Sequence, residues 1–173
     1  MKSAVTPLSL GTDRLANLLL RYAIPSIIAM TSSSLYNIID SIFIGHGVGA
    51  LAISGLAITL PLMNIASAFG SMVGIGAAAI ISIRLGEGNR TAAENTLGNV
   101  VLLNILIGML FMIVSLLFLD PILYFFGASE QTIGYARDFM QIILAGAVVT
   151  HMYLGLNEVL RASGYPQKAM FIM

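Results

Sequence analysis

Four long stretches of apolar residues follow one another along the chain, separated by short polar connections. They run over about residues 18–44, 53–83, 97–119 and 133–160. A helix needs about 20 mostly apolar residues to cross the hydrocarbon core of a bilayer, and each stretch reaches that length. The pattern therefore predicts four transmembrane helices, the first two of which contain Pro25 and Pro61.

Glycine and charged residues mark the connections between these helices. Gly45-His46-Gly47 joins the first two, residues 86–90 join the second and third, and residues 120–129 precede the fourth. Because such short loops make consecutive helices antiparallel neighbours, we expect a bundle. Thr91 and Glu94 have the spacing of a capping box, so the third helix should begin before its apolar run.

The end of the sequence is apolar as well. Residues 169–173 follow Pro166-Gln167-Lys168, and this order predicts the start of a fifth helix at Ala169. We therefore expect the chain to be an incomplete piece of a longer membrane protein.

Composition agrees with an all-α polytopic membrane protein. Of the 173 residues, 58% are hydrophobic and 9% are charged, whereas soluble domains carry about 25% charged residues. The net charge of zero gives no indication of a nucleic-acid partner. The sequence has no cysteine, no HExxH motif and no Walker loop, so we expect neither an enzyme nor a nucleotide-binding protein, and no cofactor.

Lysine and arginine lie unevenly on the two sides of the predicted bundle. One side collects Lys2, Arg14, Arg21, Arg84, Arg90, Arg161 and Lys168, and the other has Arg137. By the positive-inside rule, this difference predicts a cytoplasmic N-terminus.

Asp40 is the most informative polar position, because a carboxylate within a membrane helix is costly and is a functional candidate by default. Ser33, Tyr36 and Asn37 precede it by seven, four and three residues, which places them on the same helical face. This face would suit the wall of a hydrated cavity, where Asp40 could exchange a proton or bind sodium through oxygen ligands. Alternatively, Asp40 lies near its helix end and reaches interfacial water.

The second predicted helix has a polar face of its own, with Asn64, Ser67, Ser71 and Gly74 spaced by three and four residues. For Asn64 we favour a place in the same cavity. For the serine and glycine residues we favour close helix packing, since Gly70, Gly74 and Ala78 form a small-xxx-small series.

Three further polar positions have simpler interpretations. Asn104 should form a hydrogen bond to a neighbouring helix. His151 lies in an uncharged stretch and either does the same or relays protons. Glu158 and Arg161 are three residues apart, which favours a local ion pair.

Several passages together resemble the multidrug and toxic compound extrusion family. They are residues 22–25, 37–45, 56–61, 84–89, 156–164 and 166–170. Their order and spacing cover the chain from about Asp13 to Met173. The resemblance implies a twelve-helix carrier with two six-helix lobes, of which this chain would be the first part of the N-terminal lobe.

The resemblance also implies a function. Family members exchange sodium ions or protons for bulky drugs, often cationic, across the cell (inner) membrane, and Asp40 looks like the acid of the family's N-lobe cation site. We expect such a fragment to be inactive alone. Two alternatives remain open: an exporter of lipid-linked sugars from the same superfamily, and a small scaffolding membrane subunit.

Overall fold

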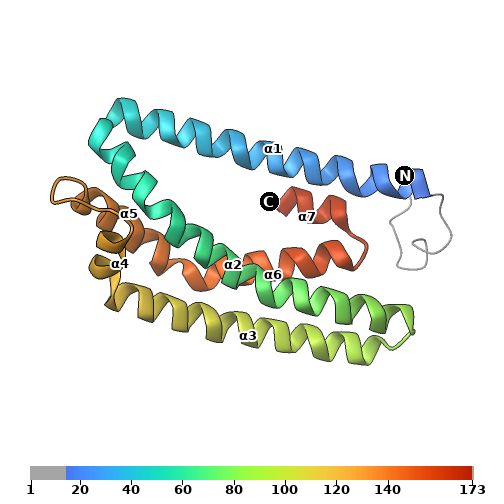
Figure 1. Ribbon diagram of the computed structural model, residues 1–173. Helices are drawn as coiled ribbons and strands as arrows, with labels where there is room; N and C mark the ends of the chain where they lie inside the picture. Colours follow the sequence, from blue (N-terminus) through green and yellow to red (C-terminus); the bar gives the residue numbers. More distant parts are fainter. Residues whose placement is uncertain (1–14, 173) are drawn as a thin grey trace.

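The computed structural model describes residues 15–172, and every regular element in that range is a helix. In chain order these are α1 (Leu15–Gly47), α2 (Ala50–Gly86), α3 (Arg90–Leu117), α4 (Leu119–Phe125), α5 (Ile133–Ala145), α6 (Ala147–Ala162) and α7 (Pro166–Ile172) (Figure 1). Within the described residues, three helices are long and apolar enough to span a membrane, or four if the bent pair α5–α6 counts as one span. The predicted all-α polytopic fold is confirmed.

The first three helices match the predicted spans: α1 and α2 extend beyond them at both ends, and α3 begins earlier and ends two residues sooner. As predicted, α3 begins before its apolar run, at Arg90. The predicted capping box is wrong, however, because the residue that caps α3 is Asn89. Its side-chain oxygen accepts a hydrogen bond from the backbone N–H of Ala92 at 3.0 Å, which satisfies one of the unpaired donors at the helix start.

The fourth predicted span is not one continuous helix. It divides into α5 and α6, which meet at an angle of 59°. Gly146 lies at the break, and its N–H donates to the carbonyl of Ile143 at 3.2 Å, three residues back. Glycine is a weak helix former in a helix interior, which explains why the break falls there.

The predicted start of a fifth helix at Ala169 is three residues late. α7 begins at Pro166, and proline suits the first helical position because the N–H that it lacks would have no partner there. Asn157 of α6 donates from Nδ2 to the Ala169 carbonyl at 2.9 Å and so holds α7 against α6.

The centre of the molecule is the packing of α2, α3 and α6 (Figure 1). One apolar cluster, which includes Leu62, Leu123 and Met140, lies toward α4 and α5. A second, which includes Ile81 and Val100, lies toward the α2–α3 turn. Between them is a stretch that we call the glycine seam. It consists of Gly70, Gly74, Asn104, Gly108, His151 and Gly155.

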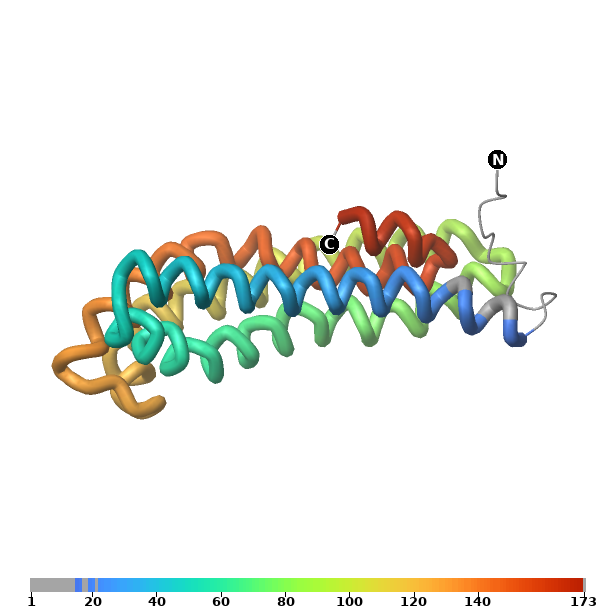
Figure 2. The backbone as a smooth tube through the Cα atoms, turned by 90° about the horizontal axis from the view of Figure 1, so that it is seen from above, coloured from blue at the N-terminus to red at the C-terminus, as the bar shows by residue number. Residues whose placement is uncertain are grey.

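α1 lies apart from this core. It meets α2 at their shared turn, diverges from it, and packs against α7 further back along its length (Figures 1 and 2). In its most apolar 18-residue window only 6% of residues are buried, compared with 17% in α2 and 22% in α3. The exposed apolar side chains of α1 are typical of a helix that faces lipid or other membrane helices.

Candidate functional site

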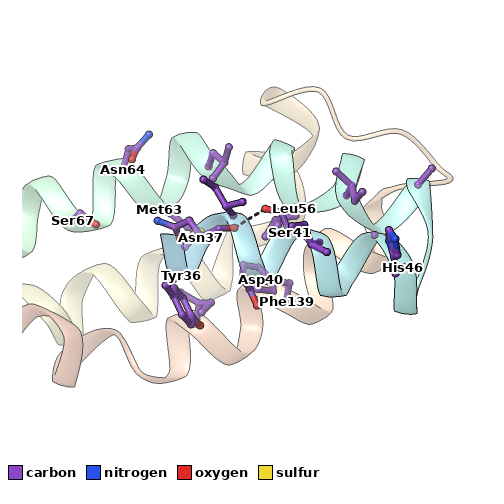
Figure 3. Close-up of a pocket in the computed structure, with 17 residues that line it drawn as sticks. Tyr36, Asn37, Asp40, Ser41, His46, Leu56, Met63, Asn64, Ser67 and Phe139 are labelled. Carbon is purple, nitrogen blue, oxygen red and sulfur yellow. Dashed lines mark hydrogen bonds between the residues drawn. The ribbon is translucent and has the colours of Figure 1, made fainter. Parts of the chain in front are cut away.

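A groove lies between α1 and α2 near their shared turn, and α5 closes part of it (Figure 3). Its volume is about 1170 Å³. We call it the Asp40 groove. The polar residues that line it are Tyr36, Asn37, Asp40, Ser41, His46, Asn64 and Ser67.

The local sequence explains how these residues come to share one space. On α1, Tyr36, Asn37 and Asp40 are spaced by three and four residues and therefore lie on one helical face. α1 and α2 are joined by a tight turn in which Gly49 has a φ of 113°, a conformation that glycine adopts without steric cost. The two helices therefore meet at this end and separate with distance from it.

Asp40 supplies the charge of the groove. The residue is half-buried, and no hydrogen bond or ion pair of its carboxylate is found among the described residues. Nearby, the Ser41 hydroxyl donates to the Asn37 carbonyl at 2.8 Å. The described lining includes one acid and neither lysine nor arginine, so the groove attracts cations rather than anions.

The donor atoms suit a small, hard cation. The groove lining carries oxygen atoms of the kind that hard cations prefer, in the Asp40 carboxylate, the Asn37 amide and the Ser41 hydroxyl, whereas Asn64 lies further along α2 (Figure 3). Within the described residues, no group of three or more His, Cys, Asp and Glu side chains is placed to hold a metal ion. A cation here would therefore be held by one carboxylate together with neutral oxygens.

The structure brings together four of the five residues that the sequence pointed to: Tyr36, Asn37, Asp40 and Asn64. Ser33 does not line the groove, because α1 has already diverged from α2 at that level. His46 was expected in a connection but belongs to the last turn of α1. The sequence pattern missed Phe139 and Ile143, which reach the groove from α5 through tertiary packing alone.

Two buried polar side chains, Asn104 and His151, lie in the glycine seam, and within the described residues neither forms the predicted hydrogen bond to a neighbouring helix. The alternative for His151, a proton relay, stays a prediction. Asn104 does not bond a neighbouring helix: its Nδ2 donates to the Val100 carbonyl of its own helix at 3.0 Å. It packs against α6 where Gly155 leaves room, since a Cβ on Gly155 would lie 2.2 Å from that Nδ2. His151 likewise bonds its own helix, with Nδ1 2.7 Å from the Ala147 carbonyl.

The predicted ion pair between Glu158 and Arg161 is also absent from the described part of the chain. Arg161 instead donates to Asn157 Oδ1 at 3.2 Å. The partly buried ion pair of this structure lies at the opposite end, where Arg137 of α5 donates through Nε and Nη2 to the two carboxylate oxygens of Asp120 at 2.7 and 2.5 Å. This bidentate ion pair links α4 to α5.

Membrane-length helices around a groove with one unpaired acid define a polytopic α-helical membrane protein of the kind that includes ion-coupled carriers. The MatE family model matches residues 25–173. The chain belongs to the MatE family.

Relatives of known structure or curated function agree with this assignment. The multidrug export protein MepA of Staphylococcus haemolyticus is 26% identical over 155 residues, which are 90% of this chain and 34% of that protein. An outward-facing multidrug resistance MATE family transporter of the MOP superfamily matches with a TM-score of 0.79 and 27% identity, over 88% of this chain and 34% of its own. The chain thus spans about a third of the length of these relatives.

A third similar structure has a binding pocket that is described as different in polarity. It is a MOP superfamily transporter from Pyrococcus furiosus, described as having a binding pocket of reverse polarity that suggests a different function. Its TM-score is 0.85 at 25% identity, over 98% of this chain and 37% of its own. The shared fold therefore does not by itself determine pocket charge, and the groove residues must be considered directly.

Proposed function

We propose that this chain is the first part of the N-terminal lobe of a carrier that exports drug-like organic compounds, often cationic, in exchange for sodium ions or protons. The observation that carries the proposal is the Asp40 carboxylate, which has no partner among the described residues, in a groove whose described lining includes neither lysine nor arginine. The multidrug export function of the MepA relative supports the same reading. In this proposal Asp40 binds the coupling cation.

The groove offers separate features for the ion and for an organic compound. Asn37 supplies a neutral oxygen one helical turn from Asp40, Asn64 lines the groove further along α2, and Tyr36 and Phe139 add aromatic surface (Figure 3). Aromatic faces attract organic cations when the site excludes water. We propose that cation binding at Asp40 favours the state that releases the drug, because a ligand shifts two states only through its different affinity for them.

The membrane potential determines how much free energy each cation supplies for export. One positive charge that moves down 100 mV supplies about 2.3 kcal/mol. Since each tenfold ratio costs about 1.4 kcal/mol, a single cation supports roughly a fortyfold concentration ratio. Such a ratio suits the export of toxic compounds present at low levels.

The distribution of charge supports an orientation in the cell (inner) membrane with the N-terminus in the cytoplasm. The α2–α3 turn with Arg84 and Arg90 lies at the same end of the molecule as the α6–α7 turn with Arg161 and Lys168 (Figure 1). The opposite end has Arg137, which is paired with Asp120. The positive-inside rule assigns the arginine-rich end to the cytoplasm.

The test is ethidium efflux from cells that express the complete reading frame, with sodium present and absent. Asp40→Asn should abolish efflux at equal expression, since the amide cannot provide the charge. Asp138→Asn is the matched control, because this acid is exposed on α5 and does not line the groove. Loss of efflux on removal of sodium would identify sodium as the coupling ion, and persistence would identify the proton.

Two results would contradict the proposal. Equal efflux by the native protein and Asp40→Asn would leave Asp40 as an interfacial residue. No efflux by either, with both proteins in the membrane, would favour an exporter of lipid-linked sugars or a scaffolding subunit.

A further inference from the structure

His151 has an open acceptor position deep inside the molecule. The residue is fully buried, and its Nδ1 lies 2.7 Å from the Ala147 carbonyl oxygen. Because a carbonyl only accepts, Nδ1 carries the hydrogen and Nε2 is left with a lone pair. Among the described residues, Nε2 has no hydrogen-bond partner. Such a group in a native interior calls for an explanation.

The surroundings of the ring decide what can reach that lone pair. A Cβ on Gly70 of α2 would lie 3.2 Å from the His151 Cα, and one on Gly108 of α3 would lie 3.4 Å from its Cβ. The Phe111 ring is 5.5 Å from the imidazole between centroids. Nε2 has almost no accessible surface, so neither a water molecule nor another segment can touch it unless the helices move. A hydronium ion likewise reaches Nε2 only when the helices briefly move apart.

The charged residues of the packed helices lie far along the chain from this layer. They are Arg84 on α2, Arg90 and Glu94 on α3, Arg137 and Asp138 on α5, Glu158 and Arg161 on α6, and Lys168 on α7. The nearest of them in sequence is Glu158, seven residues away, or about 10 Å along the helix. Tyr153 is the other titratable group of α6, two residues on and therefore on a different face. The Phe111 ring is the remaining feature that favours a positive charge on His151.

We propose that His151 Nε2 is a proton-binding position in the glycine seam, separate from Asp40, and that proton uptake there loosens the crossing of α2 and α6. An N–H bond forms at Nε2, the imidazole becomes an imidazolium ion, and a hydronium ion becomes water. The new donor has no acceptor among the described residues, and a charge in a dry interior is costly. Protonation therefore favours a state in which α6 moves away from Gly70 and water enters.

His151 lies close to the break between α5 and α6, about which α6 can move. The ring bonds Ala147, the first residue of α6 after the 59° break at Gly146. A change in the angle of that break would move α6 without stretching a continuous helix. The break at Gly146 is thus a hinge close to His151, about which α6 moves when the ring takes up a proton.

The first test is direct, because the chain has two histidines. In His46→Gln, nitrogen NMR of labelled histidine in lipid reports the His151 ring alone. We expect the Nδ1–H tautomer at high pH and a ring that carries hydrogen on both nitrogens after acidification. An Nε2–H tautomer at high pH, or a ring that stays neutral throughout, would overturn the proposal.

The second test asks whether protonation loosens the seam. Amide hydrogen exchange of residues 147–155, corrected for its intrinsic pH dependence, should rise about tenfold from pH 8 to pH 5 in the native protein. His151→Phe keeps an aromatic ring without a titrating nitrogen and should show no such rise. An equal rise in both proteins, or none in either, would refute the coupling. These measurements do not depend on transport, so they stand apart from the test of Asp40.

Discussion

The Asp40 groove and the glycine seam are both polar regions within membrane helices, yet they differ in almost every physical respect. The groove lies where α1 and α2 separate, holds about 1170 Å³ of open space, and leaves Asn64 exposed. The seam lies where α2, α3 and α6 cross most closely, and Asn104 and His151 within it are fully buried. The same residue type, asparagine, thus occurs in both settings.

The difference shows how the surroundings of a polar side chain in a membrane protein determine the free-energy cost of its burial and whether it serves folding or binding. In the seam, Asn104 satisfies one of its groups on its own helix and fills the space left by Gly155. In the groove, no internal partner of the Asp40 carboxylate is found among the described residues, so a ligand or water must compensate it. The seam contributes to folding, and the groove is available for binding.

The largest effect should come from filling the seam. In Gly74→Ala the new methyl group would lie 2.4 Å from the Gly155 carbonyl oxygen, which we expect to destabilise the protein by about 3 kcal/mol. The control is Gly76→Ala, where nothing lies within 4 Å and better helix propensity should stabilise by up to about 1 kcal/mol. Denaturant unfolding in detergent measures both, and similar stabilities would show that the crossing is looser than described.

A smaller effect should distinguish the two asparagines. Asn104→Ala removes a buried side chain and its hydrogen bond to Val100, and should cost about 2 kcal/mol. Asn64→Ala changes an exposed side chain of the groove and should alter stability by no more than about 0.5 kcal/mol. The same unfolding assay applies. Equal costs would mean that the groove is closed in the intact protein.

The smallest expected effect is a difference in chemical access. The chain has no cysteine, so single substitutions can be labelled without background. Ser67→Cys in the groove should react with a water-soluble maleimide at least about tenfold faster than Ser115→Cys, whose position is 3% exposed. Both substitutions make the same chemical change. Equal rates, with both proteins folded, would remove the distinction between an open and a dry region.

Much of the fold and part of the candidate site could be predicted from the sequence. The three-and-four-residue spacing was enough to predict that Tyr36, Asn37 and Asp40 share a face of α1, and the structure places them in one groove with Asn64. The role of these residues in binding a cation stays a prediction. Ser33 obeys the same spacing and still falls outside the groove, because helical periodicity carries no information on where two helices diverge.

Local pattern also could not predict the partners of the buried polar groups. Asn104 and His151 bond carbonyls one turn back on their own helices, at Val100 and Ala147, where contacts between helices were expected. Whether a buried polar side chain bonds its own helix or a neighbouring helix depends on how closely the neighbouring helix approaches. In the seam, Gly70, Gly108 and Gly155 bring the backbones so close that little room remains for a bond across.

Hydropathy along the chain determined the membrane class, the number of apolar stretches and the approximate helix limits, because these follow from the length of hydrocarbon that each segment must cross. Tertiary structure alone decided three further features: the 59° angle between α5 and α6, the divergence of α1 from α2, and the position of Phe139 in the groove. Each depends on the packing of segments far apart in sequence. Packing is set by shape and close approach in three dimensions, which a one-dimensional pattern of polarity does not encode.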